Sequence, residues 1–304
     1  MAAEQLYAKL LKPAELQLKG STDWIVVPDG GLWALPFQAL QPFKNHYLIE
    51  DHAIAYTPSL RVLREMEQLR VRNRTRETLA SFGNLLATGN PLLGNETGKR
   101  VELAYRDERL SPLPEAEREV ETLGRLYGQA QSEVYIRAEA REDRFKKEAS
   151  NFKTLHLATH GLLNNASPMY SHLVLSTSEN SGEEDGLLET WEIMNLRLRA
   201  DLVVLSACDT ARGRIAAGEG VIGLAWAFFV AGTPTTVVSQ WKVESQSTTE
   251  LMTFFHRARL RELPSKSPFA TARALRRAEL QLLRTQDYAH PFYWAPFVVV
   301  GDPN

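Results

Sequence analysis

The sequence contains one cysteine, Cys208, among 304 residues. A single cysteine excludes an internal disulfide bond and a metal site built from several cysteines. The sequence also lacks a large excess of either charge, because it contains 35 lysine and arginine residues and 37 aspartate and glutamate residues. Without a strong net field, direct binding to nucleic acid or to an anionic membrane is not expected. The composition therefore directs attention to the chemistry of one thiol.

Long apolar stretches are absent too. The sequence has no run of about 20 apolar residues. Its N-terminal segment mixes glutamate and lysine into a helical pattern instead of forming a signal-peptide core. We expect a soluble, cytoplasmic protein without a membrane-spanning segment. Hydrophobic residues make up 44% of the chain, which is enough for a large core in one domain or two.

What is present is a regular alternation of apolar strands and helical segments. After a first strand at Trp24 to Pro28, extended pieces are expected at Leu32 to Phe37 and at Tyr47 to Tyr56. Strands are predicted at residues 85–88, 132–137, 154–158, 171–176, 202–205, 235–239 and 297–300, and helices at 59–69, 115–127, 139–150, 221–230, 246–259 and 269–285. Such alternation predicts an α/β fold with a mostly parallel sheet and helices on both faces.

Two predicted strands end at residues that can act as a base and a nucleophile. His160 follows the strand at 154–158, and Cys208 follows the strand at 202–205, 48 positions after the histidine. Caspases show a similar separation of about 50 residues. An imidazole beside a thiol favours the thiolate and later protonates the leaving amine. Adjacent parallel strands would hold the pair at one sheet edge without a third residue. The N–H groups of Gly161 and Cys208 could form an oxyanion hole.

The segments around this pair resemble consecutive blocks of the CHAT family, a bacterial branch of caspase-like cysteine peptidases. These blocks are His-Leu-Ala-Thr-His-Gly at 156–161, Leu-Ser-Ala-Cys-Asp-Thr at 205–210, Gly-Glu-Gly-Val-Ile-Gly-Leu-Ala at 218–225 and Ala-Gly-Thr at 231–233. Similar segments occur at 27–30, at 35–40, at 112–114 with Glu119, and at 290–295 with Gly301. The resemblance therefore extends over nearly the whole chain.

The resemblance implies a caspase–haemoglobinase-like fold, a His160/Cys208 dyad, and kinship with separases and caspases of clan CD. Residues 1–110 would form a pseudo-caspase-like portion, and residues 111–304 the catalytic portion. The implied function is a cysteine endopeptidase that needs no cofactor and cleaves a protein or peptide substrate under the control of a regulatory protein. Family members often carry upstream helical repeats that sense a partner. This sequence contains none, so we expect that such repeats belong to a longer protein or that the chain works without them.

The residues that select the substrate are expected after the strand at 235–239. Relatives that cut after basic residues line the pocket with an acidic side chain, because burying a cation without a counter-charge is costly. Where the family often reads Trp-Pro-Val-Asp-Asp, this chain reads Trp-Lys-Val-Glu-Ser at 241–245. The candidate substrate-binding residues are Asp209, Trp241, Glu244 and Ser245. Lys242 and the serines at 206 and 245 weaken the expected negative potential, so acceptance of small or apolar residues stays open.

Other functions have weaker support in the sequence. The glycines at 218–223 match the dinucleotide fingerprint, but a loop of several residues separates them from the end of the preceding strand, which is the wrong context. The seven histidines show no ligand spacing, so no metal site is expected, and His156 is expected to be buried and hydrogen-bonded. An inactive CHAT-like module that only binds partners stays open.

The single thiol and the lack of a metal cage predict proteolysis that needs the thiol and resists chelators. Iodoacetamide should abolish cleavage of a diverse peptide library, whereas a metal chelator should leave the cleavage rate unchanged, with products read by mass spectrometry. Inhibition by the chelator that added zinc reverses would contradict this prediction.

Overall fold

The computed structural model describes residues 2–77, 83–92, 110–164, 166–177, 184–206, 219–262 and 268–304. Their main feature is an eight-stranded sheet with the strand order β1-β2-β11-β10-β9-β5-β3-β4. The strands are β1 (Asp23–Val26), β2 (Ala53–Tyr56), β3 (Gly83–Pro91), β4 (Ser132–Arg137), β5 (Phe152–Ala158), β9 (Leu202–Leu205), β10 (Thr235–Ser239) and β11 (Phe297–Gly301). Neighbouring strands pair in parallel except β10 and β11, which are antiparallel. The predicted mostly parallel sheet is confirmed.

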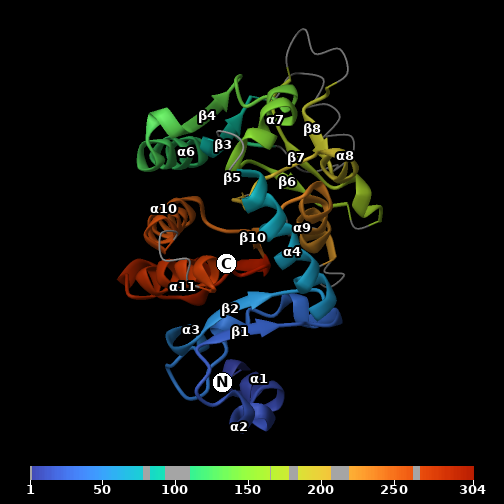
Figure 1. The fold of residues 1–304 in the computed structure, drawn as a ribbon. Coiled ribbons are helices and arrows are strands. Elements are labelled where there is room, and N and C mark those ends of the chain that lie inside the picture. The colour runs from blue at the N-terminus through green and yellow to red at the C-terminus, as the bar shows by residue number, and fades with distance from the viewer. Residues whose placement is uncertain are drawn as a thin grey trace.

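Helices cover both faces of this sheet, which is why its central strands are buried and why β9 is an apolar run. In β9, Val203 and Leu205 join the core on the side of α9 (Glu219–Ala231). Leu202 and Val204 join the core on the side of α10 (Ser245–Glu262) and α11 (Ala270–Leu283). Figure 1 shows α9 on one side of the sheet and α10 and α11 on the other.

The remaining helices are short, apart from α4 (Leu60–Glu77) and α6 (Pro114–Tyr127). The short helices are α1 (Ala2–Leu10), α2 (Glu15–Leu18), α3 (Leu48–Asp51), α7 (Glu142–Glu148), α8 (Thr190–Asn195) and α12 (Pro291–Trp294). Across the described ranges, no helix is both long enough and apolar enough to cross a membrane.

A small antiparallel sheet follows the carboxyl end of β5. It contains β6 (Gly161–Leu162), β7 (His172–Val174) and β8 (Leu187–Glu189) in that order. The sequence indicated only the segment around β7. Strands of two or three residues are too short to show an alternating pattern, so this sheet could not be predicted.

The two extended pieces expected in the N-terminal part are wrong in most of their length. Short 3-10 helices occupy residues 30–34 and 37–39, and in the second piece α3 occupies the first half, so that only the last four residues form a strand, β2. The hydroxyl of Tyr56 holds the start of the 3-10 helix at 37–39, because it accepts from the N–H of Phe37 at 2.9 Å. Glu50 helps to start α3, because its carboxylate accepts from the N–H of Tyr47 at 2.8 Å.

The portions expected at 1–110 and 111–304 share the large sheet. β3 of the first portion lies between β5 and β4 of the second, and β2 pairs with β11 near the end of the chain. The division at residue 110 therefore does not separate two sheets, and it stays a prediction about function.

Glu279 on α11 is a buried acid in the apolar core. It is 2% exposed and lines a cavity of about 10 Å³ together with Gln38 and Tyr56. Its Oε1 atom has no hydrogen-bond partner among the described residues. Burial raises the pKa of Glu279 well above its usual value, against the opposing charge of Arg276. The folded protein therefore favours the neutral acid.

Replacement of Glu279 by Gln is expected to reduce the pH dependence of stability. The folded state holds this proton more tightly than the unfolded state does. The resulting stabilisation is complete below the unfolded pKa of about 4.3 and is lost as pH rises through the folded value. Glutamine does not titrate, so Glu279→Gln should gain free energy of unfolding over the wild type between pH 5 and pH 8 in urea titrations. The exposed Glu139→Gln is the control, and an unchanged pH dependence in Glu279→Gln would count against the argument.

Candidate active site

His160 lies just beyond the carboxyl end of β5, beside the end of β9. The register of these parallel strands places Leu157 opposite Leu205, and the N–H of Ser206 donates to the carbonyl of Leu157 at 2.9 Å. The pairing thus continues one residue past β9. His160 is 7% exposed, so the sheet edge shields most of its imidazole from water.

Cys208 and Asp209 lie outside the residues that the structure describes. Ser206, two positions before the cysteine, is the last described residue on this side, and its side chain is buried. The structure therefore fixes where the chain leaves β9, close to the point where β5 leads into His160.

A backbone carbonyl that the sequence did not indicate holds the imidazole of His160. Nε2 of the ring lies 2.8 Å from the carbonyl oxygen of Ser111, in the segment before α6. Because a carbonyl only accepts, Nε2 carries the proton, and Nδ1 is the basic nitrogen of the neutral ring. The histidine therefore has a partner beyond the two strands, and the expectation that these strands bring His160 and Cys208 together stays a prediction. A main-chain oxygen has no side-chain signature, so sequence reasoning could not find it.

Asn90 fixes the segment that presents this carbonyl. Its Oδ1 accepts from the N–H of Leu113 at 2.7 Å, and its Nδ2 donates to Glu117 at 2.8 Å. Asn90 has a φ of 47°, a left-handed conformation that asparagine tolerates better than most residues. The Ser111 carbonyl is thus tied to the end of β3 as well as to α6.

Gly161 begins β6 and pairs with Leu173 of β7. The N–H of Val174 donates to the carbonyl of His160 at 2.8 Å, so residue 160 belongs to a hydrogen-bonded pair of this ladder. Successive residues of an antiparallel strand alternate between the two sides, so the N–H of Gly161 points away from β7. This direction is a condition for the oxyanion role expected for Gly161, which stays a prediction.

The segment after β10 is anchored to its surroundings by side chains. Gln240 donates from Nε2 to the carbonyl of Trp33 at 2.7 Å, and the indole N–H of Trp241 donates to the carbonyl of Phe292 at 3.3 Å. Trp241 also packs against the core on the side of α10 and α11. The start of the proposed specificity segment is therefore held by contacts on two sides.

Glu244 caps α10. Its carboxylate oxygens accept from the N–H groups of Gln246 at 2.9 Å and Ser247 at 2.7 Å. Burial would raise the pKa of Glu244, but these hydrogen bonds outweigh it and bring the pKa below its usual value. Ser245 is the first residue of α10. The structure thus gives Glu244 a role in starting the helix, and substrate binding by Trp241, Glu244 and Ser245 stays a prediction.

His156 is buried and hydrogen-bonded as expected, and it belongs to a larger polar chain. Its Nε2 lies 2.7 Å from Glu119 of α6, and its Nδ1 lies 3.1 Å from Nε2 of His256 on α10. Nδ1 of His256 lies 2.9 Å from the hydroxyl of Tyr127. His156 and His256 are both fully buried, and Glu119 is 2% exposed. Sequence spacing gave no sign of His256 or Tyr127, because their contacts join separate helices.

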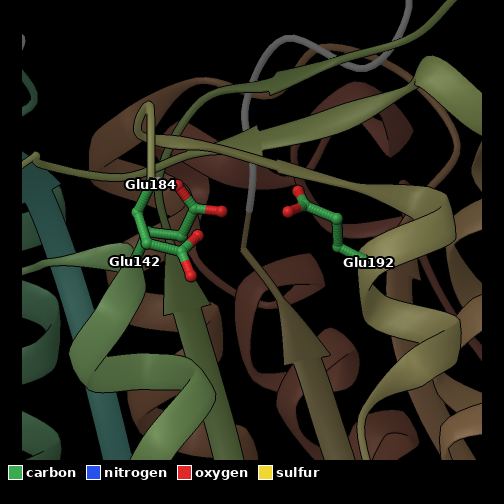
Figure 2. Close-up of side chains that lie close together, drawn as sticks. All are labelled: Glu142, Glu184 and Glu192. Carbon is green, nitrogen blue, oxygen red and sulfur yellow. The ribbon is translucent and has the colours of Figure 1, made fainter. Parts of the chain in front are cut away.

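Three glutamates form the one group in the described ranges that is close enough to hold a cation. Figure 2 shows Glu142 of α7, Glu184 before β8, and Glu192 of α8. Lys146 contacts all three, with Nζ 2.8 Å from Glu142 and 2.7 Å from Glu192. Burial raises the pKa of Glu142 to about 7 against the lowering effect of Lys146. The ammonium group provides the counter-charge in this cluster, which joins α7 to α8.

An apolar groove of about 550 Å³ runs between α8, α9 and the segment that follows β1. It is lined by Pro28, Asp29, Gly30, Trp33, Pro58, Pro168, Met169, Thr190, Met194, Gly223 and Trp226. Met169 and Trp226 are 43% and 37% exposed. Trp33 connects the groove to the segment after β10 through its contact with Gln240. Exposed apolar surface of this kind marks sites that bind proteins or ligands.

The sequence of this chain is similar to known proteins over nearly its whole length. The family model described as CHAT domain matches residues 1–302. Human tetratricopeptide repeat protein 28 is 24% identical over 335 residues, covering 97% of this chain and 13% of that protein. The mouse protein of the same name is 25% identical, with the same coverage. The chain thus spans only 13% of the length of these curated relatives.

Two solved structures share the fold. Separase in the separase–securin complex of Saccharomyces cerevisiae has a TM-score of 0.52 and 15% identity, covering 91% of this chain and 15% of that chain. The Arg-specific cysteine proteinase gingipain R of Porphyromonas gingivalis has a TM-score of 0.53 and 12% identity, covering 99% of this chain and 66% of that chain. At these identities the likeness shows the fold, which is caspase-like.

Loss of the cap on α10 should cost stability in a pH-dependent way. Glu244→Ala is expected to lower the free energy of unfolding by about 1 kcal/mol at pH 7. Because the folded pKa of Glu244 is lowered, its contribution is present above the unfolded pKa and disappears as pH falls through the folded value. The difference from the wild type should therefore shrink toward pH 3 in urea titrations. Glu250→Ala, within the same helix, is the control, and a pH-independent loss would argue against a cap by the carboxylate.

Proposed function

The chain belongs to the CHAT domain family, and on that basis we propose that it is a cysteine endopeptidase whose catalytic pair is His160 and Cys208. Residues 1–110 would support the catalytic portion at 111–304. The caspase-like fold agrees with this proposal, and the structural neighbour gingipain R is described as an Arg-specific cysteine proteinase.

The observation that carries the proposal is the register of β5 and β9. Leu157 lies opposite Leu205 in parallel strands, and His160 and Cys208 each follow their strand partner by three residues. Three residues span at most about 10 Å, so both side chains can reach the same stretch of the sheet edge. The buried imidazole and its contact with Ser111 supply an oriented base at this edge.

The chemistry follows from the state of the imidazole. With Nε2–H donated to Ser111, Nδ1 of His160 takes the thiol proton of Cys208, and the thiolate attacks the scissile carbonyl. Nδ1 then gives this proton to the leaving amine, which leaves an acyl group on the sulfur. Water hydrolyses the thioester with His160 as the base, and the thiol is regenerated. The N–H groups of Gly161 and Cys208 would stabilise the oxyanion of both steps.

The apolar groove favours a second function beside or instead of catalysis. A protein partner or an upstream domain could bind there and regulate the peptidase, or the chain could be an inactive CHAT-like interaction module. Met169 and Trp226 offer the exposed apolar area that such a contact requires. An iodoacetamide-type probe discriminates between these functions, because a catalytic Cys208 would react as a thiolate at neutral pH.

Cys208→Ala and His160→Ala should each leave a folded protein that has lost proteolysis by roughly a thousandfold or more. The two residues act as one unit, so the double variant should be no less active than either single variant. Cleavage rates on peptides from a library, with circular dichroism to confirm folding, provide the measurement.

His46→Ala serves as the matched control for these variants. His46 lies in the segment before α3, where its Nε2 is 2.6 Å from Asp51 at the end of that helix, away from the β5–β9 edge. It should keep wild-type activity. Equal activity of the wild type and Cys208→Ala would end the proposal.

A further inference from the structure

Helix α6 and the segment before it meet β5 at two places. Glu119 contacts Nε2 of His156, and the Ser111 carbonyl contacts Nε2 of His160, at 2.7 and 2.8 Å. The two histidines are four positions apart, which is about 13 Å along a strand. Because α6 connects β3 to β4, and these strands are parallel to β5, the helix runs back along the strand direction (Figure 1). The two contacts therefore fix α6 lengthwise against β5.

A neutral His256 is compatible with a pattern of protons that satisfies the buried chain containing Glu119. Burial is the main cause that lowers the pKa of His256 well below its usual value, so this ring is neutral. The Tyr127 hydroxyl then donates to Nδ1 of His256, and Nε2–H of His256 donates to Nδ1 of His156. Nε2–H of His156 donates to Glu119. Each contact has one donor and one acceptor, and the chain ends on the carboxylate.

We propose that Glu119 is a positioning residue for His160, because its hydrogen bond with His156 sets the place of α6 along β5 and so keeps the Ser111 carbonyl on Nε2 of His160. The catalytic meaning of this contact rests on the proposed peptidase function. The positioning itself concerns the tautomer of His160 and holds with or without catalysis.

A buried carboxylate suits this task better than an apolar contact. Apolar packing tolerates small shifts of a helix, whereas a hydrogen bond weakens steeply when its length or angle changes. Thr249 of α10 lies 3.4 Å from the second oxygen of Glu119, but the carbonyl of Ser245 is a closer acceptor for its hydroxyl at 3.1 Å, so the contact with His156 is the main one that holds the carboxylate. A buried acid is costly unless it is satisfied in this way, and its benefit is a defined position.

The test compares Glu119→Ala with Glu119→Gln. Alanine removes the acceptor, so the Ser111 carbonyl should no longer be held on His160, and kcat should fall about 10- to 100-fold with little change in KM. Glutamine keeps an acceptor for His156 and can donate to Thr249, so it should stay within about threefold of the wild type. Nitrogen-15 spectra of the histidine rings should show loss of the Nε2–H form of His160 in Glu119→Ala alone, with His160→Ala used to assign the signal.

Tyr135→Phe is the control for general loss of stability. It removes another bond between a hydroxyl and a carboxylate, from Tyr135 of β4 to Glu148 of α7 at 2.7 Å, and leaves α6 and β5 intact. This variant should lose stability without changing the tautomer of His160 or the pH profile of cleavage.

Two results would overturn the proposal. One is an unchanged His160 tautomer in a folded Glu119→Ala. The other is an equal loss in Glu119→Gln and Glu119→Ala, which would point to charge and not to position. If Glu119→Ala does not fold, the glutamine variant still tests the proposal, because a folded Glu119→Gln that lost the Nε2–H form of His160 would overturn it and one that kept this form would support it. If the wild type cleaves nothing, the peptidase function fails, and the ring spectra still test the positioning.

Discussion

The parallel pairing of β5 with β9 is the constraint on which the proposed chemistry depends. The strands that lead to His160 and to Cys208 run side by side in one direction, with Leu157 opposite Leu205, so both strands end at the same edge of the sheet. Parallel strands need a long crossover, and here it contains the small sheet and α8. Helices cover each face of these strands, which accounts for the apolar run of β9 and for the burial of most of β5.

Around this pairing, polar groups within the core take directional contacts that fix α6. Asn90 holds the segment before the helix, Ser111 contacts His160, and Glu119 contacts His156. A buried polar group is expensive to leave unpaired, so each contact restricts where the helix can lie against the strands. The sheet edge that carries His160 is therefore supported by a buried polar chain that joins α6 to β5 and α10.

The role of an acidic side chain in this protein depends on the groups that surround it. Glu244 was a candidate for substrate recognition because of its place in a family pattern, yet its carboxylate starts α10. Glu142, Glu184 and Glu192 gather around Lys146, and the lysine supplies the counter-charge that a metal would otherwise supply. Charge type alone does not distinguish a cap, an ion cluster and a substrate contact, because the distinction depends on the donors within about 3 Å.

The sequence by itself determined the fold class, the family and most central elements, including α6, β4, β9 and β10. These segments carry strong local signals, such as Pro114 at the start of α6 and the apolar run of β9. Only the tertiary structure decided what holds His160, how Glu119 and His256 join His156, and that Glu244 caps a helix. These contacts join residues distant in the chain or use backbone atoms, and neither leaves a periodic pattern. The physical reason is that local propensity depends on residues close together in the sequence, whereas the hydrogen-bond partners of a buried group depend on how distant segments pack.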